Sequence, residues 1–220
     1  LIYNLGFKLA YHLPLDNAVK LGLVAPYEIT VVQIPLNNKD KNVQSGSKAN
    51  PFFQTEVKKY NYLSELVDKA PPGKGKMFKV LNRMRFIYGL KSKTDAAKFL
   101  LDKIIPQSER TLIFAGGIAQ AEELCENSFH SKIKKDNTSF EDFKEKKINR
   151  MSCVNAVNEG HNIADLDVGL VVQLNSKALN LVQRIGRIVR YRPGHRAQIY
   201  ILCAMGTQDE AWVAKAIAEL

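Results

Sequence analysis

Strand-like and helix-like segments alternate through the second half of the chain, and this alternation is the strongest constraint on its fold. Short apolar or β-branched runs, each typical of a strand, cover 111–114, 151–154, 168–174 and 198–203. Helical patterns lie between and after these runs. Strands that alternate with helices pair in parallel and are covered on both faces, so we predict an α/β fold with a three-layer parallel sheet.

The helices are expected at four places. Thr94 is predicted to cap the first of them, whose apolar face is formed by Ala97, Leu100, Leu101 and Ile104. The others are predicted at 117–123, at 177–190 and from about residue 209 onward. Asp209 and Glu210 begin the last helix, where an acidic pair is ordinary compensation of the helix dipole.

The first half of the chain is less regular. Residues 1–26 are interpreted as a lead-in that contains one short helix at 14–22, and 27–36 is predicted to be a strand. The polar stretch 37–50 is predicted to be a surface loop, and 52–93 a helical pair interrupted by Pro71-Pro72-Gly73. We therefore expect one domain over 27–220 with an insertion at 37–93.

The basic residues are concentrated in two windows. The chain has 32 Lys and Arg against 22 Asp and Glu, a formal net charge of +10, which favours a polyanionic partner. Eight bases and no acid lie between Asp68 and Asp95, and six bases and no acid between Asp167 and Asp209.

Several classes of protein are disfavoured by the composition. Three widely spaced cysteines, without nearby histidines at metal-ligand spacing, predict reduced core thiols and no metal site. No apolar stretch reaches the ~18 residues of a membrane helix, and no signal peptide is recognisable. We expect an intracellular protein, cytoplasmic or nucleoid-associated, with no membrane partner. A start at Leu1 suggests a piece of a longer protein.

The most informative segment is QRIGRIVR at 183–190. On a helix its apolar residues cover one side, whereas Gln183, Arg187 and Arg190 lie on the other, with Arg184 at the edge. Like charges on one helix face repel, and guanidinium groups bind phosphate bidentately, so a bound phosphate would explain the cluster. A solvated basic face, or arginines paired with acids, is the alternative.

This segment resembles motif VI of superfamily 2 helicases and translocases, Q/H-R-x-G-R-x-x-R. Two other segments agree in order and distance. VNAVNEGHNIA at 154–164 is similar to motif V, and LIFAGG at 112–117 to motif IV. The resemblance covers about 95–205, and the lead-in is similar to the segment that joins the two motor domains in this family.

The resemblance implies a RecA-like C-terminal helicase domain, the second of two motor domains. ATP would bind in the cleft between them, with Mg²⁺ held mainly by an N-terminal P-loop domain of the same protein. Arg187 would act as the arginine finger with Arg190 beside it. The ATP-binding and coupling residues would be Gln183, Arg184, Gly186, Glu159, Gly160 and Asn162. Because half of the ATP site would lie in the other domain, we expect this chain alone to be inactive.

The nucleic acid is expected at the loops that follow the strands. The candidate residues are Gly116 and Gly117, Asn155 in motif V, and Lys74, Lys76 and Lys79 in the first basic window. That window extends to Lys93 and also contains Phe78, Phe86 and Tyr88. Helical spacing makes these aromatics core residues, with base stacking as the alternative.

The form of the motifs favours one nucleic acid over the other. The leading Gln of motif VI and the E-G-x-N form of motif V resemble DNA-acting branches, such as restriction-type, recombination and repair helicases. DNA is therefore the expected partner, with an RNA helicase domain as the alternative. A second alternative is a standalone nucleic-acid-binding module that never meets a P-loop domain.

Overall fold

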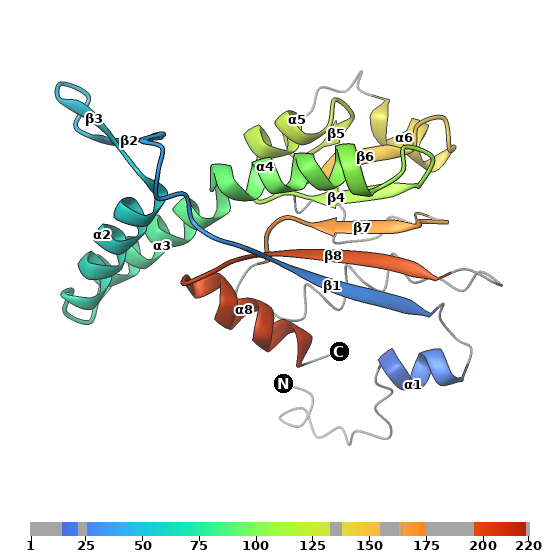
Figure 1. Cartoon of the computed structure of the whole chain (residues 1–220), viewed down its shortest axis with the longest axis horizontal. Helices are drawn as coiled ribbons and strands as arrows, with labels where there is room; N and C mark the ends of the chain where they lie inside the picture. Colours follow the sequence, from blue (N-terminus) through green and yellow to red (C-terminus); the bar gives the residue numbers. More distant parts are fainter. Residues whose placement is uncertain are drawn as a thin grey trace.

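The computed structural model describes residues 15–21, 26–132, 138–154, 163, 165–174 and 196–218. Six strands form one sheet in the order β1-β8-β7-β4-β6-β5 (Figure 1). They are β1 (Tyr27–Ile34), β4 (Thr111–Phe114), β5 (Ser128–Phe129), β6 (Arg150–Cys153), β7 (Val168–Val171) and β8 (Ala197–Ala204). Every neighbouring pair in this sheet is parallel, so all six strands end at the same edge, called here the carboxyl edge.

Helices cover both faces of this sheet. The helices of the body are α4 (Lys91–Phe99), α5 (Ile118–Leu124), α6 (Ser139–Lys144) and α8 (Gln208–Ile217), and α1 (Leu15–Lys20) precedes β1. Buried residues of α6 and α8 pack with Leu112 and Phe114 on one face, and those of α4 pack with Ile113 on the other. Alternate residues of β4 thus supply both cores. The predicted three-layer α/β fold is confirmed as a RecA-like fold.

The insertion lies beyond the carboxyl end of β1 (Figure 1). It consists of a hairpin, β2 (Val43–Gly46) with β3 (Pro51–Gln54), and two helices, α2 (Glu56–Asp68) and α3 (Lys74–Tyr88). The prediction of a loop over 37–50 is therefore wrong for β2. The sequence there has no apolar alternation that would predict a strand. The hairpin is held instead by hydrogen bonds to the Ser45 hydroxyl. This hydroxyl accepts from Gln54 Nε2 (2.6 Å) and from Lys59 Nζ (3.1 Å).

Buried polar contacts attach the insertion to the body. The Glu56 carboxylate is fully buried and accepts hydrogen bonds from the backbone N–H groups of Asn37 and Ser92, both at 2.9 Å. Ser92 lies in the first turn of α4, where a carboxylate is favourable. The Tyr60 hydroxyl accepts from the Gln208 N–H at 2.9 Å. These bonds fix the orientation of α2 relative to α4 and α8.

Two predictions about the helix after the insertion are wrong. Thr94 does not cap it, because α4 already begins at Lys91 and the buried Thr94 hydroxyl donates to the Leu90 carbonyl one turn earlier. Ile104 is half exposed rather than in the core. It ends a π-helical turn, η2 (Leu100–Ile104), whose wider winding moves Ile104 out of phase with the apolar face of α4. No helix in the described part of the chain is long and apolar enough to span a membrane.

Candidate functional site at the carboxyl edge

Three predicted motif segments begin at the ends of neighbouring strands. The turn at 115–117 follows β4, the segment from Asn155 onward follows β6, and the segment that contains QRIGRIVR follows Leu174, shortly after β7. In the sheet β4 lies between β6 and β7. Strands β6, β4 and β7 therefore end side by side at the carboxyl edge, where α/β proteins bind their ligands.

All of the predicted ATP-site residues lie outside the described residues. These are Gln183, Arg184, Gly186, Arg187, Arg190, Glu159, Gly160 and Asn162, together with Asn155 of the predicted nucleic-acid site. The roles assigned to them by resemblance stay predictions. Among the described residues, no group of three or more His, Cys, Asp or Glu could hold a metal ion.

The two glycines after β4 differ in their surroundings. A Cβ atom on Gly116 would lie 2.8 Å from the Tyr88 carbonyl oxygen, so the turn can approach α3 only with glycine there. The Gly116 N–H donates to Gln120 Oε1 at 2.8 Å, which engages that amide within the protein. Gly117 precedes α5, and a Cβ atom on it would meet open space. Gly117 thus borders open space, whereas Gly116 is packed against α3.

A hollow of about 260 Å³ joins this turn to the end of α3. Arg85, Tyr88 and Gly89 line one side of it, and Gly116 and Gly117 the other. The structure therefore brings the first basic window next to the motif IV turn, although the two are about 30 residues apart in sequence. Among the residues that line this hollow, Arg85 is the cation, and no motif in the sequence marks it as a site residue.

Helix α3 carries basic residues at its N-terminal end, where positive charge is unfavourable. It has no acidic residue, and its five bases are Lys74, Lys76, Lys79, Arg83 and Arg85. Lys74 and Lys76 lie in the first turn, where the helix dipole is positive, and no side chain caps that end. Within the described part of the chain none of the five forms an ion pair. A bound polyanion would relieve this repulsion.

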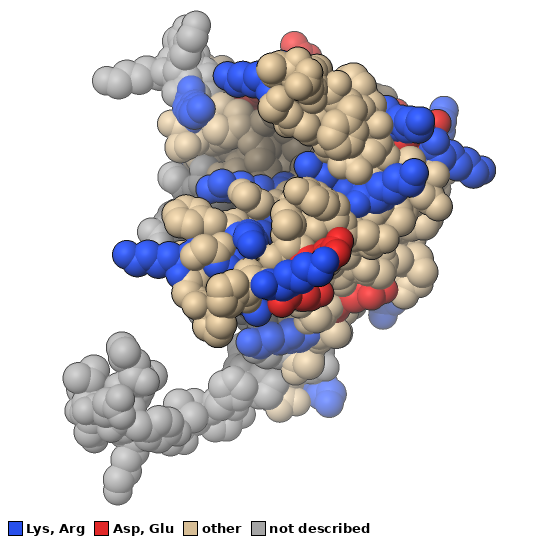
Figure 2. All heavy atoms as spheres, turned by 90° about the vertical axis from the view of Figure 1, so that its left-hand side faces the viewer, with Lys and Arg blue, Asp and Glu red and all other residues tan. Residues whose placement is uncertain are grey.

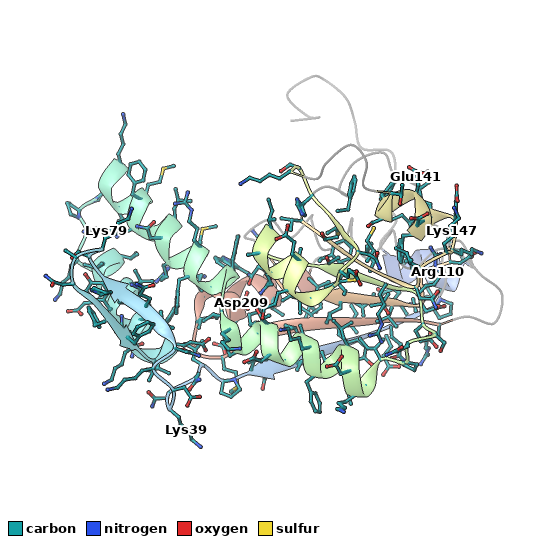
Figure 3. The ribbon with its side chains drawn as sticks, turned by 90° about the horizontal axis from the view of Figure 1, so that it is seen from above. Lys39, Lys79, Arg110, Glu141, Lys147 and Asp209 are labelled. Carbon is teal, nitrogen blue, oxygen red and sulfur yellow. The ribbon has the colours of Figure 1, made fainter. Side chains whose placement is uncertain are left out.

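The predicted lysines reach solvent to different extents. Lys74 is exposed, whereas Lys76 and Lys79 are partly buried. Figure 2 faces the carboxyl edge and the insertion, and Lys and Arg side chains are spread across this face while the acids occupy smaller patches. Figure 3 shows Lys79 on the insertion, away from the sheet. The basic surface thus lies on α3 and reaches the carboxyl edge at Arg85.

Lys93 belongs to the same sequence window but not to this surface. Its side chain is fully buried, and its Nζ donates to Asp209 Oδ2 at 2.7 Å and to Gln173 Oε1 at 2.8 Å. Asp209, also fully buried, accepts from the Ala204 N–H at 2.9 Å and from Gln173 Nε2 at 3.0 Å. Lys93 is therefore no phosphate contact, which corrects the extent of the predicted basic surface.

This buried cluster joins α4, the end of β7 and the start of α8. Figure 3 shows Asp209 where the sheet meets the insertion. Asp209 had been interpreted as ordinary dipole compensation, but it is one half of a buried ion pair. Burial lowers the pKa of Lys93, and Asp209 opposes that shift. Burial, with the Asp209 carboxylate adding to it, raises the pKa of the nearby Cys203 thiol to about 11.

A larger cavity, of about 590 Å³, lies at the opposite edge of the sheet. Its lining mixes acids and a base, Glu109, Asp167 and Arg196, and includes none of the predicted site residues. The sign of its charge is therefore not that of an anion site, and the carboxyl edge stays the better candidate.

One sequence comparison found a match to a protein family. Residues 95–192 match the family model of the helicase conserved C-terminal domain. The match supports a helicase conserved C-terminal domain. All three motif segments lie within it or at its edge, at 112–117, 154–164 and 183–190. No curated protein matches the sequence.

The chain is similar to several solved structures. S. cerevisiae Dbp5, in a variant bound to RNA and ADP BeF3, has a TM-score of 0.50 at 14% identity over 58% of this chain and 36% of its own. The E. coli DEAD-box protein SrmB, bound to the regulator RraA, gives 0.48 at 19% over 58% and 78%. The Pyrococcus furiosus Hef helicase domain gives 0.46 at 18% over 74% and 38%. This chain thus spans little more than a third of the Dbp5 and Hef chains.

Proposed function

We propose that this chain is the second motor domain of an ATP-dependent helicase or translocase. The observation that supports it best is that β7, β4 and β6, which the three motif segments contain or follow in sequence, are neighbours in one parallel sheet. A P-loop domain of the same protein would complete the ATP site. The fold alone would suit other functions, so the proposal depends on these segments and not on the sheet.

The ATP side of the site is assigned to the segment after β7. Arg187 is proposed to reach the γ-phosphate as an arginine finger, with Arg190 beside it, because guanidinium groups bind phosphate oxygens bidentately. Gln183, Arg184 and Gly186 would contact the nucleotide, and Glu159, Gly160 and Asn162 would couple it to the facing domain. ATP hydrolysis would supply the free energy for movement, and Mg²⁺ would be held mainly by the P-loop domain.

The nucleic-acid side is assigned to the basic face. Gly117 borders open space in the turn after β4, and Lys74, Lys76 and Lys79 form a positive surface on α3. Asn155 would contribute from the segment after β6. DNA is proposed as the partner from the form of motifs V and VI. RNA is the second candidate, since Dbp5, which shares the fold, was solved with RNA.

Arg187→Ala, in a protein that carries both motor domains, tests the catalytic assignment. Loss of the finger should lower the nucleic-acid-stimulated ATPase rate on the order of 10³–10⁵-fold, with affinity for nucleic acid nearly unchanged. The matched control is Arg196→Ala, because Arg196 is an exposed arginine at the opposite edge, 3.6 Å from Glu28. Its ATPase rate should equal that of the wild type.

An unchanged rate in the Arg187 variant would refute the finger and favour the standalone binding module. ATP hydrolysis by the 220-residue chain alone, at a helicase-like rate, would contradict the need for a P-loop domain. Single-stranded DNA and RNA of one sequence, compared in the same ATPase assay, test the choice of partner. Stronger stimulation by RNA would overturn the DNA assignment and leave the motor assignment intact.

A further inference from the structure

The outer face of α3 carries apolar side chains that the core does not use. Phe78 is 66% exposed and Met77 63% exposed, whereas Ile87 further along the helix is fully buried. Phe86 and Tyr88 are partly buried and pack against the small core that includes Trp212. The helical spacing that made all three aromatics core residues therefore holds for Phe86 and Tyr88 and fails for Phe78.

Cations lie on the same side of the helix as Phe78. At 100° per residue, Lys74, Phe78 and Arg85 project within about 40° of one another. All three are exposed. One exposed apolar residue is common on protein surfaces, but here an aromatic ring lies between two cations on a helix without acids. This is the combination that binds the backbone and bases of a nucleic acid.

The face is continuous with the hollow at the carboxyl edge. Arg85 lines that hollow opposite Gly116 and Gly117. Phe78 precedes Arg85 by seven residues, about 10 Å along the helix axis, and Lys74 lies about 6 Å beyond Phe78. A strand that leaves the turn after β4 would therefore meet Arg85, then Phe78, then Lys74.

We propose that α3 binds a single strand of nucleic acid, with a base stacked on Phe78 and phosphates at Arg85 and Lys74. The inference rests on the proposed function and adds that the bound nucleic acid is single-stranded. Bases in a duplex are already stacked on one another and expose no face to a protein ring, whereas an unpaired base does. Phe78 would thus make the insertion selective for single strands.

Phe78→Ala tests this in the 220-residue chain, with fluorescence anisotropy of a labelled oligo-dT and of a labelled duplex. Affinity for oligo-dT should fall about tenfold or more, and affinity for the duplex should stay the same. Phe78→Trp should retain single-strand binding. The matched control is Phe99→Ala, which removes a ring that is 59% exposed at the far end of α4 and should change neither affinity.

An oligonucleotide with abasic sites provides the second arm. It offers phosphates without bases, so wild type and Phe78→Ala should bind it equally, whereas Arg85→Ala should bind it more weakly and with a smaller salt dependence. Equal loss of duplex and single-strand binding in Phe78→Ala, or no loss in either, overturns the stacking role. If the wild-type chain binds none of these probes at low salt, the nucleic-acid side of the proposed function fails as well.

Discussion

Helix α3 and the start of α4 are separated by two residues, yet their cations lie in opposite environments. The five bases of α3 lack ion pairs among the described residues. Two of them, Lys74 and Lys76, lie in its first turn, at the positive end of the helix dipole. Lys93, in the first turn of α4, is fully buried against Asp209, which is 116 residues away in sequence. The same residue type is thus proposed to bind nucleic acid on α3 and forms a buried ion pair on α4. The tertiary partner, and not the local sequence, decides between them.

The buried pair is the place where this comparison predicts the largest effect on stability. Lys93→Met leaves the Asp209 carboxylate buried without its counter-charge, which should lower the free energy of unfolding by about 3–5 kcal/mol. The matched control is Lys91→Met, because Lys91 pairs with Asp95 on the surface, where such a pair contributes at most about 0.5 kcal/mol. Urea denaturation of the two variants measures the difference.

Asp209→Asn tests the other half of the buried ion pair. The amide keeps the shape and one acceptor for the Ala204 N–H but removes the charge, so this change should also be destabilising. The double variant should lose less stability than the two single changes add up to, because no unpaired charge remains. Strict additivity would show that Lys93 and Asp209 contribute independently, against the account given for the pair.

Glu56 tests the attachment of the insertion and should have the next largest effect. Glu56→Ala removes the acceptor for the N–H groups of Asn37 and Ser92, and leaving these donors unsatisfied should cost about 2 kcal/mol. Glu65→Ala is the control from the same helix, since Glu65 is exposed and pairs only with Lys69. Urea denaturation that finds the two variants equally stable would contradict the anchoring role of Glu56.

The strands were predictable because burial on both faces of a parallel sheet requires continuous apolar runs. Thr111–Phe114 was placed correctly from four residues alone. The hairpin strand β2 was not, because its pairing depends on polar contacts from α2 and β3. The burial of Ile104 was predicted wrongly. The π-helical turn η2 is wider than an α-helical turn and places Ile104 at the surface.

The site was predictable to a different degree. Motif spacing predicts a site in the segments after β4, β6 and β7, and the structure shows these three strands as neighbours in the sheet. The burial of Lys93 and Asp209 and the exposure of Phe78 were not predictable. Whether a lysine is buried, or a helical aromatic exposed, depends on which elements pack against it, and that information lies far away in the chain.

The proposed nucleic-acid interface on α3 and the carboxyl edge is tested most directly by the salt-dependent binding of a labelled single strand to the 220-residue chain. Lys74, Lys76 and Lys79 replaced together by Ala should weaken binding and lower the magnitude of the log K against log salt slope by about two to three. A control with Lys103, Lys144 and Lys215 replaced by Ala removes the same charge from η2, α6 and α8. If α3 forms the interface, this control should keep the wild-type affinity and slope. Equal loss in both triple variants would show that only net charge matters, and would contradict a nucleic-acid interface formed by α3 and the carboxyl edge.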